Sequence, residues 1–558
     1  MVAKSLGPSL AALSRCTGIR TPKGEIFMTD SSPLHFAHVL RRAATGVFCS
    51  AALLLTNAAE AANDPIRGQV QLDQPTILAG GTAVVYAVVS FEGIDLDPGP
   101  VKDRPSLNVA LVLDRSGSMA DEGKIEYLRR AAKLAVDRLG NKDTLSVVEY
   151  DDQITVMWPA RRVGNLGEVK GMIDALDPRG STNLTGGMMR GVDEAKDALD
   201  GPASAPGTIT RVILMSDGLA NQGITDPAEI SRLVRGAKHD GIRISAMGLG
   251  RDYDEDLMQA IAENGGARYY YIEHPTQMAR VFQEEMGSMF ETCARDVEIH
   301  FSGKAIVRKV DVVGYDDASG TKDARRGLED VFEGEKRSVL LRLEIASPSS
   351  GRSDLGQVTL KYKTAKGGEA KSFTQTLAVD VSSDRAAVEK ARNKQASAEA
   401  ALAESDRVQQ EQVKLFQKGE RDKATKNMTT LAKDLEAKNK VLNDERITRK
   451  IEAINVENRQ MTNAVSDSAQ KDYLKSSKQR LYHAKTGKRT GFALQQGDKG
   501  LEVERLQEAL KKAGTYKGAI DGKYDDDVKE AVEAYQRSKS LPADGVAGAA
   551  TLDSMGAY

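Results

Sequence analysis

Short apolar segments alternate with amphipathic ones between residues 106 and 290. The apolar segments read as buried strands, and the segments between them carry apolar residues at helical spacing, as from Ile125 to Leu139. The predicted strands are LNVALVLD, TLSVVEYD, ITVMWP, VILMS, RISAMGL and ARYYYI. This alternation predicts a doubly wound α/β fold, which places ligands at the carboxyl ends of its strands.

Five residues with hard oxygen atoms lie next to predicted strand ends. They are Asp114, Ser116 and Ser118 in LVLDRSGSM, Thr182 in GSTNLTGG and Asp217 in VILMSDG. Such oxygens are ligands for Mg²⁺, Ca²⁺ or Mn²⁺. Two carboxylates balance a divalent ion and neutral hydroxyls add coordination without surplus charge, so the cation stays attractive to an acidic side chain of a protein partner. The sequence predicts a metal site, with Mg²⁺ as the expected cation.

A structural turn is the alternative for the first loop. Ser and Asp commonly cap helices, and Asp114 with its neighbours would then cap the helix that follows. The D-x-S-x-S pattern alone fits both interpretations. Thr182 and Asp217, at the boundaries of other elements, favour the metal site.

These motifs resemble the von Willebrand factor type A domain and its metal-ion-dependent adhesion site, over about residues 106–290. The resemblance implies that Ser116, Ser118 and Thr182 ligate the cation directly or nearly so, and that Asp114 and Asp217 act through water. Asp121 and Glu122 stand where some integrin relatives carry a second metal site, but two acids at a helix start are also explained by the helix dipole. Tyr269 to Tyr271 form the last predicted strand, where alternation would bury Tyr270 or its two neighbours.

The flanking segments, residues 62–105 and 291–383, are rich in predicted strands. We expect both to build one antiparallel β-sandwich. This arrangement resembles the sandwich around such domains in extracellular and bacterial relatives, including inter-alpha-trypsin inhibitor heavy chains.

Residues 384–485 change character and become rich in Ala, Lys, Glu and Gln, with apolar residues at helical spacing. We expect a helical hairpin or short coiled coil with a turn at Gly419, followed by a linker over residues 486–493. The apolar stripe is explained either by ordinary packing or by a partner site. Its members are Val408, Leu415, Leu431, Leu435, Leu442, Ile447, Ile451 and Ile454.

Residues 494–558 resemble a peptidoglycan-binding domain, a small all-α fold of three helices. The domain contains a short internal repeat, DGKYDDDV and DGVAGAAT, in which Asp-Gly supplies a turn and the last residue begins a helix. Asp525 and Val528 depart from the family's usual Gly and Thr, so a helical domain that has lost ligand binding is the alternative. The matching residues are Gly500, Val503, Leu506, Gln507, Leu510, Gly514, Gly518, Asp521, Gly522, Ala531, Val532, Tyr535, Gln536, Leu541, Asp544, Gly545, Gly548 and Thr551.

Residues 1–61 have the features of a leader with a signal peptide. If translation starts at Met28, Arg41 and Arg42 precede an apolar run from Ala43 to Leu55, and Ala59-Glu60-Ala61 offers a cleavage site. An uncleaved anchor is the alternative, but the run is shorter than the roughly 20 residues that span a bilayer. We expect general secretion, a mature chain from about Ala62, no stable membrane span and a location in the periplasm or cell envelope.

The charge balance excludes a strongly basic protein. Lys and Arg number 78 against 80 Asp and Glu, a net charge of -2, so nucleic acid is not an expected partner. Removal of the leader, with six basic and three acidic residues, would leave -5. Cys16 and Cys49 would leave with it. The remaining Cys293 then has no intrachain disulfide partner and either packs as a small apolar residue or forms an intermolecular bridge.

The sequence carries no familiar catalytic motif. The histidines form no H-E-x-x-H or other close zinc pair, and neither a G-x-S-x-G elbow nor a G-x-x-x-x-G-K-[ST] loop occurs. We therefore expect no enzymatic activity. The main hypothesis is an envelope adhesion or scaffold protein that binds a protein partner and peptidoglycan. The alternatives are a non-catalytic subunit that recruits an envelope enzyme and an unrecognised peptidoglycan hydrolase.

Overall fold

The computed structural model describes residues 64–94, 104–201, 205–315, 321–348, 350–486, 494–498, 501–539 and 541–555. The predicted leader, its cleavage site, Cys16 and Cys49 lie outside the described residues, as does nearly all of the predicted linker.

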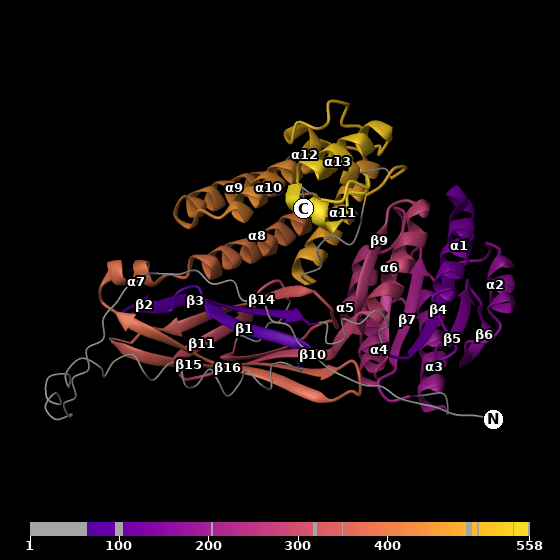
Figure 1. Ribbon diagram of the computed structural model, residues 1–558, viewed down its shortest axis with the longest axis horizontal. Helices are drawn as coiled ribbons and strands as arrows, with labels where there is room; N and C mark the ends of the chain where they lie inside the picture. Colours follow the sequence, from indigo (N-terminus) through magenta and orange to yellow (C-terminus); the bar gives the residue numbers. More distant parts are fainter. Residues whose placement is uncertain are drawn as a thin grey trace, which may run out of the picture. The chain divides into compact units, whose positions relative to one another are not determined.

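A six-stranded sheet forms the centre of residues 106–290 (Figure 1). Its order is β6-β5-β4-β7-β8-β9, and all pairs are parallel except that of the edge strand β6. The prediction of a doubly wound α/β fold is confirmed. The strands are β4 (Leu107–Asp114), β5 (Thr144–Tyr150), β6 (Ile154–Arg162), β7 (Ile209–Ser216), β8 (Arg243–Leu249) and β9 (Gly266–Ile272).

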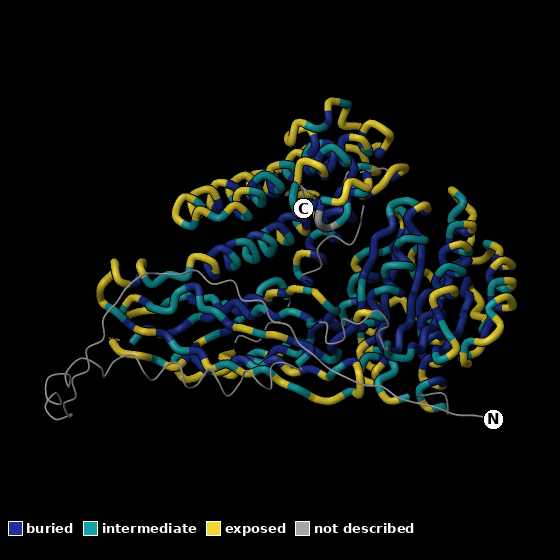
Figure 2. The backbone as a smooth tube through the Cα atoms, viewed as in Figure 1, coloured by how far each residue is buried: buried dark blue, intermediate teal, exposed yellow. Residues whose placement is uncertain are grey.

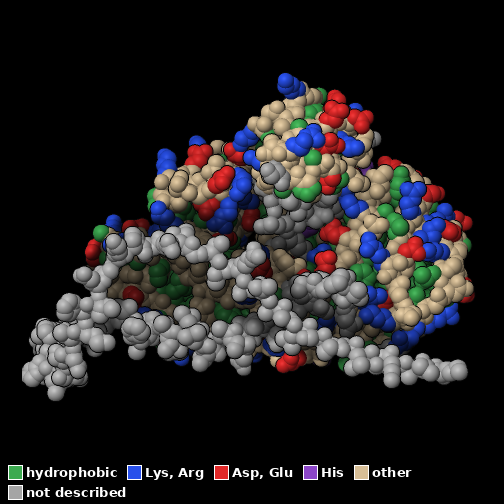
Figure 3. Space-filling view, in the orientation of Figure 1, with side chains coloured by type: hydrophobic (Ala, Val, Ile, Leu, Met, Phe, Trp, Pro, Cys, Tyr) green, Lys and Arg blue, Asp and Glu red, His purple; other side chains and the backbone are tan. Residues whose placement is uncertain are grey.

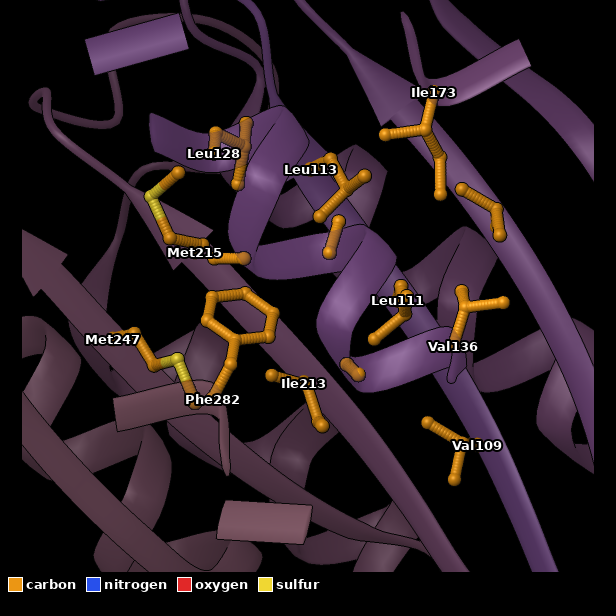
Figure 4. Close-up of a cluster of buried hydrophobic side chains, with 14 of the residues drawn as sticks. Val109, Leu111, Leu113, Leu128, Val136, Ile173, Ile213, Met215, Met247 and Phe282 are labelled. Atoms are coloured by element: carbon orange, nitrogen blue, oxygen red, sulfur yellow. The ribbon is translucent and has the colours of Figure 1, made fainter. Parts of the chain in front are cut away.

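Helices cover both faces of this sheet because successive β4 side chains point to opposite sides. Leu111 and Leu113 pack with α1, α2 and α6, whereas Ala110 and Val112 pack with α3, α4 and α5. Figure 4 shows the first of these two cores. The helices are η2 (Gly117–Gly123), α1 (Lys124–Val136), α2 (Leu166–Asp174), α3 (Leu184–Asp200), α4 (Pro227–His239), α5 (Glu255–Gly265), η3 (Pro275–Gln277) and α6 (Met278–Phe290).

All three tyrosines of β9 are buried, whereas strand alternation predicts burial on one face only. Tyr270 lies in the α1 and α6 core, and Tyr269 and Tyr271 lie in the core on the other face. The expectation was wrong because β9, although at the edge of the sheet, is covered on both faces. Tyr482, from the C-terminal part of the chain, contributes to the second of these cores.

Two further sheets come from the segments before and after the α/β region. One has the order β1-β3-β14-β11, and the other has β12-β10-β15-β16-β2, with β13 paired to β10. They share a core that joins Val89 and Leu343 of the first sheet to Phe301 and Leu360 of the second. The pairing of β2 with β16 is parallel, so the second sheet is not wholly antiparallel. The strands are β1 (Ile66–Leu72), β2 (Thr76–Leu78), β3 (Thr82–Gly93), β10 (Thr292–Gly303), β11 (Val307–Val312), β12 (Asp323–Gly327), β13 (Val331–Phe332), β14 (Lys336–Ala346), β15 (Gly351–Thr364) and β16 (Ala370–Ser382).

Cys293 packs in the same core as a small apolar residue. Its thiol is buried and donates to the Val331 carbonyl oxygen over 3.3 Å. Burial raises the pKa of the Cys293 thiol to about 12, so the side chain stays in its unreactive protonated form.

Residues 384–486 form five helices, where the sequence analysis expects a hairpin or short coiled coil. The turn at Gly419 is present, with a φ of 83°. The later turn between α9 and α10 has no glycine or proline signal: Asn443 takes a φ of 52°, and Asp444 caps α10 by accepting from the Arg446 amide over 2.8 Å. Leu435, Ile447 and other stripe residues share a core, as packing predicts. The helices are α7 (Arg385–Ala391), α8 (Lys394–Gln417), α9 (Arg421–Leu442), α10 (Glu445–Asn463) and α11 (Asp467–Thr486).

Three helices, α12 (Leu501–Lys512), α13 (Asp526–Ser538) and α14 (Ala549–Met555), make up the C-terminal module. A buried glutamine holds each Asp-Gly turn of the internal repeat. Gln507 donates to Asp521 over 2.9 Å and accepts from the Gly522 amide, and Gln536 donates to Asp544 over 2.8 Å and accepts from the Gly545 amide. The two halves of the module are therefore built in the same way.

The surface carries charges of both signs. Lysine and arginine side chains alternate with acidic ones over the visible face (Figure 3), whereas β4, β5, β7, β8 and β9 of the six-stranded sheet are buried along most of their length (Figure 2). The edge strand β6 is largely exposed or half-buried. Among the described helices, none combines the length and the apolar character that crossing a membrane requires.

Candidate metal centre

The candidate site lies where the strand order of the α/β sheet reverses. The chain runs outward from β4 through β5 to β6 and then returns to β7 on the other side of β4. Loops diverge at such a switch point and leave a crevice for ligands. Asp114 ends β4 and Asp217 follows β7, so both carboxylates lie at this crevice.

Asp114 is buried and its two carboxylate oxygens accept from different segments. Oδ1 accepts from the Ser116 amide over 2.8 Å, and Oδ2 accepts from the Ser216 hydroxyl over 2.7 Å. The Tyr150 hydroxyl also reaches Oδ2, over 3.3 Å. Asp114 does not cap α1, which begins ten residues later at Lys124 with no side-chain cap. The helix-capping interpretation of Asp114 was therefore wrong.

Ser118 joins the first loop to Asp217. Its hydroxyl lies 3.2 Å from the Ser116 hydroxyl and donates to Asp217 Oδ1 over 2.7 Å. The Lys124 ammonium group donates to the other oxygen, Oδ2, also over 2.7 Å. Asp217 is thus shared between a hydroxyl of the predicted ligand set and a cationic side chain.

Thr182 comes to the same place from the loop before α3. A Cβ atom built on Gly218 would lie 3.2 Å from Thr182 Oγ1 and 3.7 Å from Ser118 Oγ, so both hydroxyls face this glycine. A larger residue at position 218 would fill the space beside them. The structure therefore brings all five predicted residues together.

Backbone hydrogen bonds hold the three loops against one another. The Gly117 amide donates to the Gly180 carbonyl over 3.1 Å, and the Asn221 and Gln222 amides both donate to the Thr182 carbonyl over 3.2 Å. The side-chain oxygen of Asn221 in turn accepts a hydrogen bond from the Thr182 amide over 3.0 Å. These bonds position the side-chain oxygens before any ligand arrives.

The electrostatics favour a cation between the two carboxylates. Burial, together with the nearby Asp217 charge, raises the pKa of Asp114 to about 6. Lys124 compensates the charge of one of the two buried carboxylates, and a divalent ion would compensate the other. Two carboxylates and three hydroxyls are a suitable oxygen donor set for Mg²⁺, Ca²⁺ or Mn²⁺. Among the described residues no group of three or more His, Cys, Asp or Glu is placed to hold a metal, so a cation held here would need the hydroxyl oxygens as well as the two carboxylates.

Several residues that support the site were not predicted from the sequence. Ser216 and Tyr150 bond to Asp114, Asn221 positions Thr182, and Lys124 contacts Asp217. Ser216 directly precedes Asp217, and this adjacency is the one available signal. The others lie in different segments and no spacing rule identifies them. Asp121 and Glu122 are exposed in η2, ahead of α1.

The loop after β8, residues 250–254, is held by helix α11. Lys471 pairs with Asp252 over 2.9 Å, Arg251 pairs with Asp472, and Lys475 donates to the Tyr253 carbonyl over 2.9 Å. This loop follows the strand next to β7, at the same edge of the sheet as Asp217. Helix α11, which comes much later in the chain, thus supports a loop at the same edge of the sheet as the candidate metal site.

The sequence of this region matches the von Willebrand factor type A domain family over residues 108–284. The chain contains a von Willebrand factor type A domain. Residues 499–555 match the family described as "Putative peptidoglycan binding domain". Both resemblances drawn from the sequence motifs are confirmed.

Several known proteins match this chain over part of their own length. Identity is 30% over 218 residues with the Escherichia coli protein YfbK and 25% over 288 residues with the Synechocystis protein sll0103. It is 26% over 207 residues with the rat inter-alpha-trypsin inhibitor heavy chain H3. The matches cover 38%, 50% and 36% of this chain, but only 37%, 66% and 23% of these relatives.

Solved structures extend the similarity of fold beyond the von Willebrand factor type A domain. A von Willebrand factor type A protein from Catenulispora acidiphila superposes with a TM-score of 0.57 at 17% identity, and covers 74% of this chain and 96% of its own. The ArnB paralog VWA2 from Sulfolobus acidocaldarius has a TM-score of 0.51 at 16% identity, with coverages of 76% and 99%. At these identities the likeness concerns the fold alone.

Proposed function

We propose that this protein is an exported adhesion or scaffold protein of the bacterial cell envelope. The von Willebrand factor type A domain, residues 106–290, binds a protein partner through a divalent cation, and residues 494–558 bind peptidoglycan. Residues 62–105 with 291–383, and the helices of residues 384–485, form the scaffold between these two sites. The convergence of three hydroxyls and two carboxylates at the switch point supports this proposal most directly.

In this proposal Ser116, Ser118 and Thr182 hold the cation directly. Asp114 and Asp217 act through water, in keeping with the hydrogen bonds that their oxygens accept from Ser216 and Ser118. A cation held by these residues would offer an open coordination position to an acidic group of the partner. Mg²⁺ is the proposed ion, with Ca²⁺ and Mn²⁺ as alternatives for the same oxygen donors.

Lys124 favours an acidic partner. Two carboxylates balance the charge of a divalent ion, and the ammonium group on Asp217 then leaves the site with a net positive charge. Leu219 and Ile224, which are 55% and 38% exposed, lie on the loop that follows Asp217. The partner's Asp or Glu is therefore expected to be flanked by apolar side chains that cover these residues.

Calorimetry with Mg²⁺, Ca²⁺ and Mn²⁺ tests the metal site. We expect heat of binding for the native chain and none for Thr182→Ala, while Thr425→Ala, on the exposed surface of α9, serves as a matched control. Absence of heat with all three ions in the native chain would contradict the proposal.

Capture experiments separate the two binding functions. Capture of an envelope partner should be reversed by EDTA and lost in Thr182→Ala, whereas sedimentation with purified peptidoglycan should be unchanged in that variant. Equal loss of both activities would rule out the division of labour. We propose binding without catalysis, and release of soluble fragments from purified peptidoglycan by the chain would instead favour a hydrolase.

A further inference from the structure

Helix α12 of the C-terminal module lies antiparallel to helix α10. Arg459 pairs with Glu508 over 3.2 Å, Lys512 pairs with Glu452, and Arg505 donates to Gln460 over 2.8 Å. These contacts join the two helices over about two turns. The module is thus held against the helical segment by side chains of both.

A hollow of about 480 Å³ opens between these helices. Ala453 and Val456 of α10 and Ala509 of α12 line it, and Ile520 and Met555 of the module add apolar wall. Short side chains at these positions leave the hollow open. Its volume is in the range of sites that take small ligands, which is roughly 300–1,000 Å³.

Of the cationic side chains that line the hollow, Arg459, Arg505 and Lys512 have partners and Lys511 has none among the described residues. Arg459 and Lys512 are paired with Glu508 and Glu452, whereas Lys511 lines the hollow and forms no hydrogen bond or ion pair with any described residue. Apolar walls beside an unpaired ammonium group suit a ligand that carries small aliphatic groups and a carboxylate.

We infer that this hollow binds the stem peptide of peptidoglycan, whose alanine methyl groups and free carboxylates have that chemistry. The inference rests on the proposed wall binding by the C-terminal module. It adds that the wall-binding site is composite: α10 supplies one wall and the module supplies the other. Ala453 and Val456 would contact the peptide, and Lys511 would pair with its carboxylate.

The test uses the full chain and sedimentation with purified peptidoglycan. Ala509→Trp fills the hollow and should lower the apparent affinity about tenfold or more, while Lys511→Gln should lower it severalfold. Ala513→Trp is the matched control, since Ala513 is exposed one turn further on and does not line the hollow. Soluble stem peptide should compete, and glycan chains stripped of peptide should not.

The outcomes separate this inference from the proposed function. If the native chain sediments and both Ala509→Trp and Lys511→Gln sediment equally well, the composite site is wrong and wall binding stands. Competition by peptide-free glycan alone would also overturn the inference. If the native chain does not sediment, the proposed function itself fails. Circular dichroism checks the fold of each variant, and should Ala509→Trp unfold, Lys511→Gln and the competition experiment decide.

Discussion

The candidate metal centre and the C-terminal module reach their geometry in different ways. In the metal centre, Asp114, Thr182 and Asp217 come from distant parts of the chain and meet because β4 and β7 are neighbours in one sheet. In the module, Gln507 and Gln536 each hold a turn that lies 15 and 9 residues further on. The candidate metal centre depends on the packing of a whole domain, whereas the C-terminal module depends on short-range contacts that occur once in each of its two halves.

The largest effect is expected from the module's glutamines. Gln507→Leu leaves the Asp521 and Gly522 amides without their acceptor, at a cost of about 1–3 kcal/mol for the buried Gly522 amide and less for that of the exposed Asp521. A domain of this size is only marginally stable, so we expect amide protection of α12 to α14 to be lost in hydrogen exchange. Cation binding by the distant domain should not change, and persistent protection in the module would show that the turn is not critical.

The next largest effect is expected from a substitution that fills the space at the candidate metal centre without replacing any of the five oxygen-bearing residues. Gly218→Val would place carbon atoms beside the Thr182 and Ser118 hydroxyls. We expect the cation affinity measured by calorimetry to fall about a hundredfold, or roughly 2.7 kcal/mol, with little change in the melting temperature. Gly236→Val, on α4 with no atom near its added Cβ, is the control. Unchanged affinity in Gly218→Val would mean that the hydroxyls do not bind the ion.

The contact between helix α5 of the α/β region and helix α11 has a pH dependence. Burial alone would raise the pKa of Glu255, but the charges of Lys475 and Lys478 outweigh it and hold this pKa at about 2. The folded pKa lies below its ordinary value, so the stabilisation is complete above about pH 4.5 and is lost as the pH falls towards 2. After allowance for solvent screening we expect about 1–2 kcal/mol.

Hydrogen exchange of α11 measures this effect. Protection, corrected for intrinsic rates, should drop below pH 4.5 in the native chain, and Glu255→Gln should have low protection at every pH. Glu420→Gln, which removes an exposed pair with Lys423, should behave like the native chain. The same pH profile in both variants would show that the Glu255 pairs do not hold α11.

The smallest effect concerns Lys124. Lys124→Met removes a positive charge 2.7 Å from Asp217, so less repulsion opposes the cation and its affinity should rise about threefold. Association with an acidic partner should slow by a similar factor, most visibly at low salt. Stopped-flow and calorimetry measure the two quantities. A loss of cation affinity would instead make Lys124 a structural support of the metal centre.

Local periodicity and turn chemistry were sufficient to predict the α/β region and the five oxygen-bearing residues, whereas the two families were recognised from the resemblance of their sequence motifs. The parallel arrangement of apolar strands brings the residues at their carboxyl ends to one edge, which is why Asp114 and Asp217 could be paired before their distance was known. The turns between the helices of residues 384–486 were less predictable, because Asn443 and Asp444 form one of them without glycine or proline.

The amino-acid sequence by itself determined which segments become strands and helices, and which residues carry the oxygen atoms of the candidate metal centre, because these properties depend on neighbours a few positions away. Only the tertiary structure decided that Lys124 shares Asp217, that Tyr150 and Ser216 hold Asp114, and that α11 braces the loop after β8. Those contacts join residues tens to hundreds of positions apart. The packing of whole helices and strands decides which residues meet, and the spacing of residues along the chain does not predict these contacts.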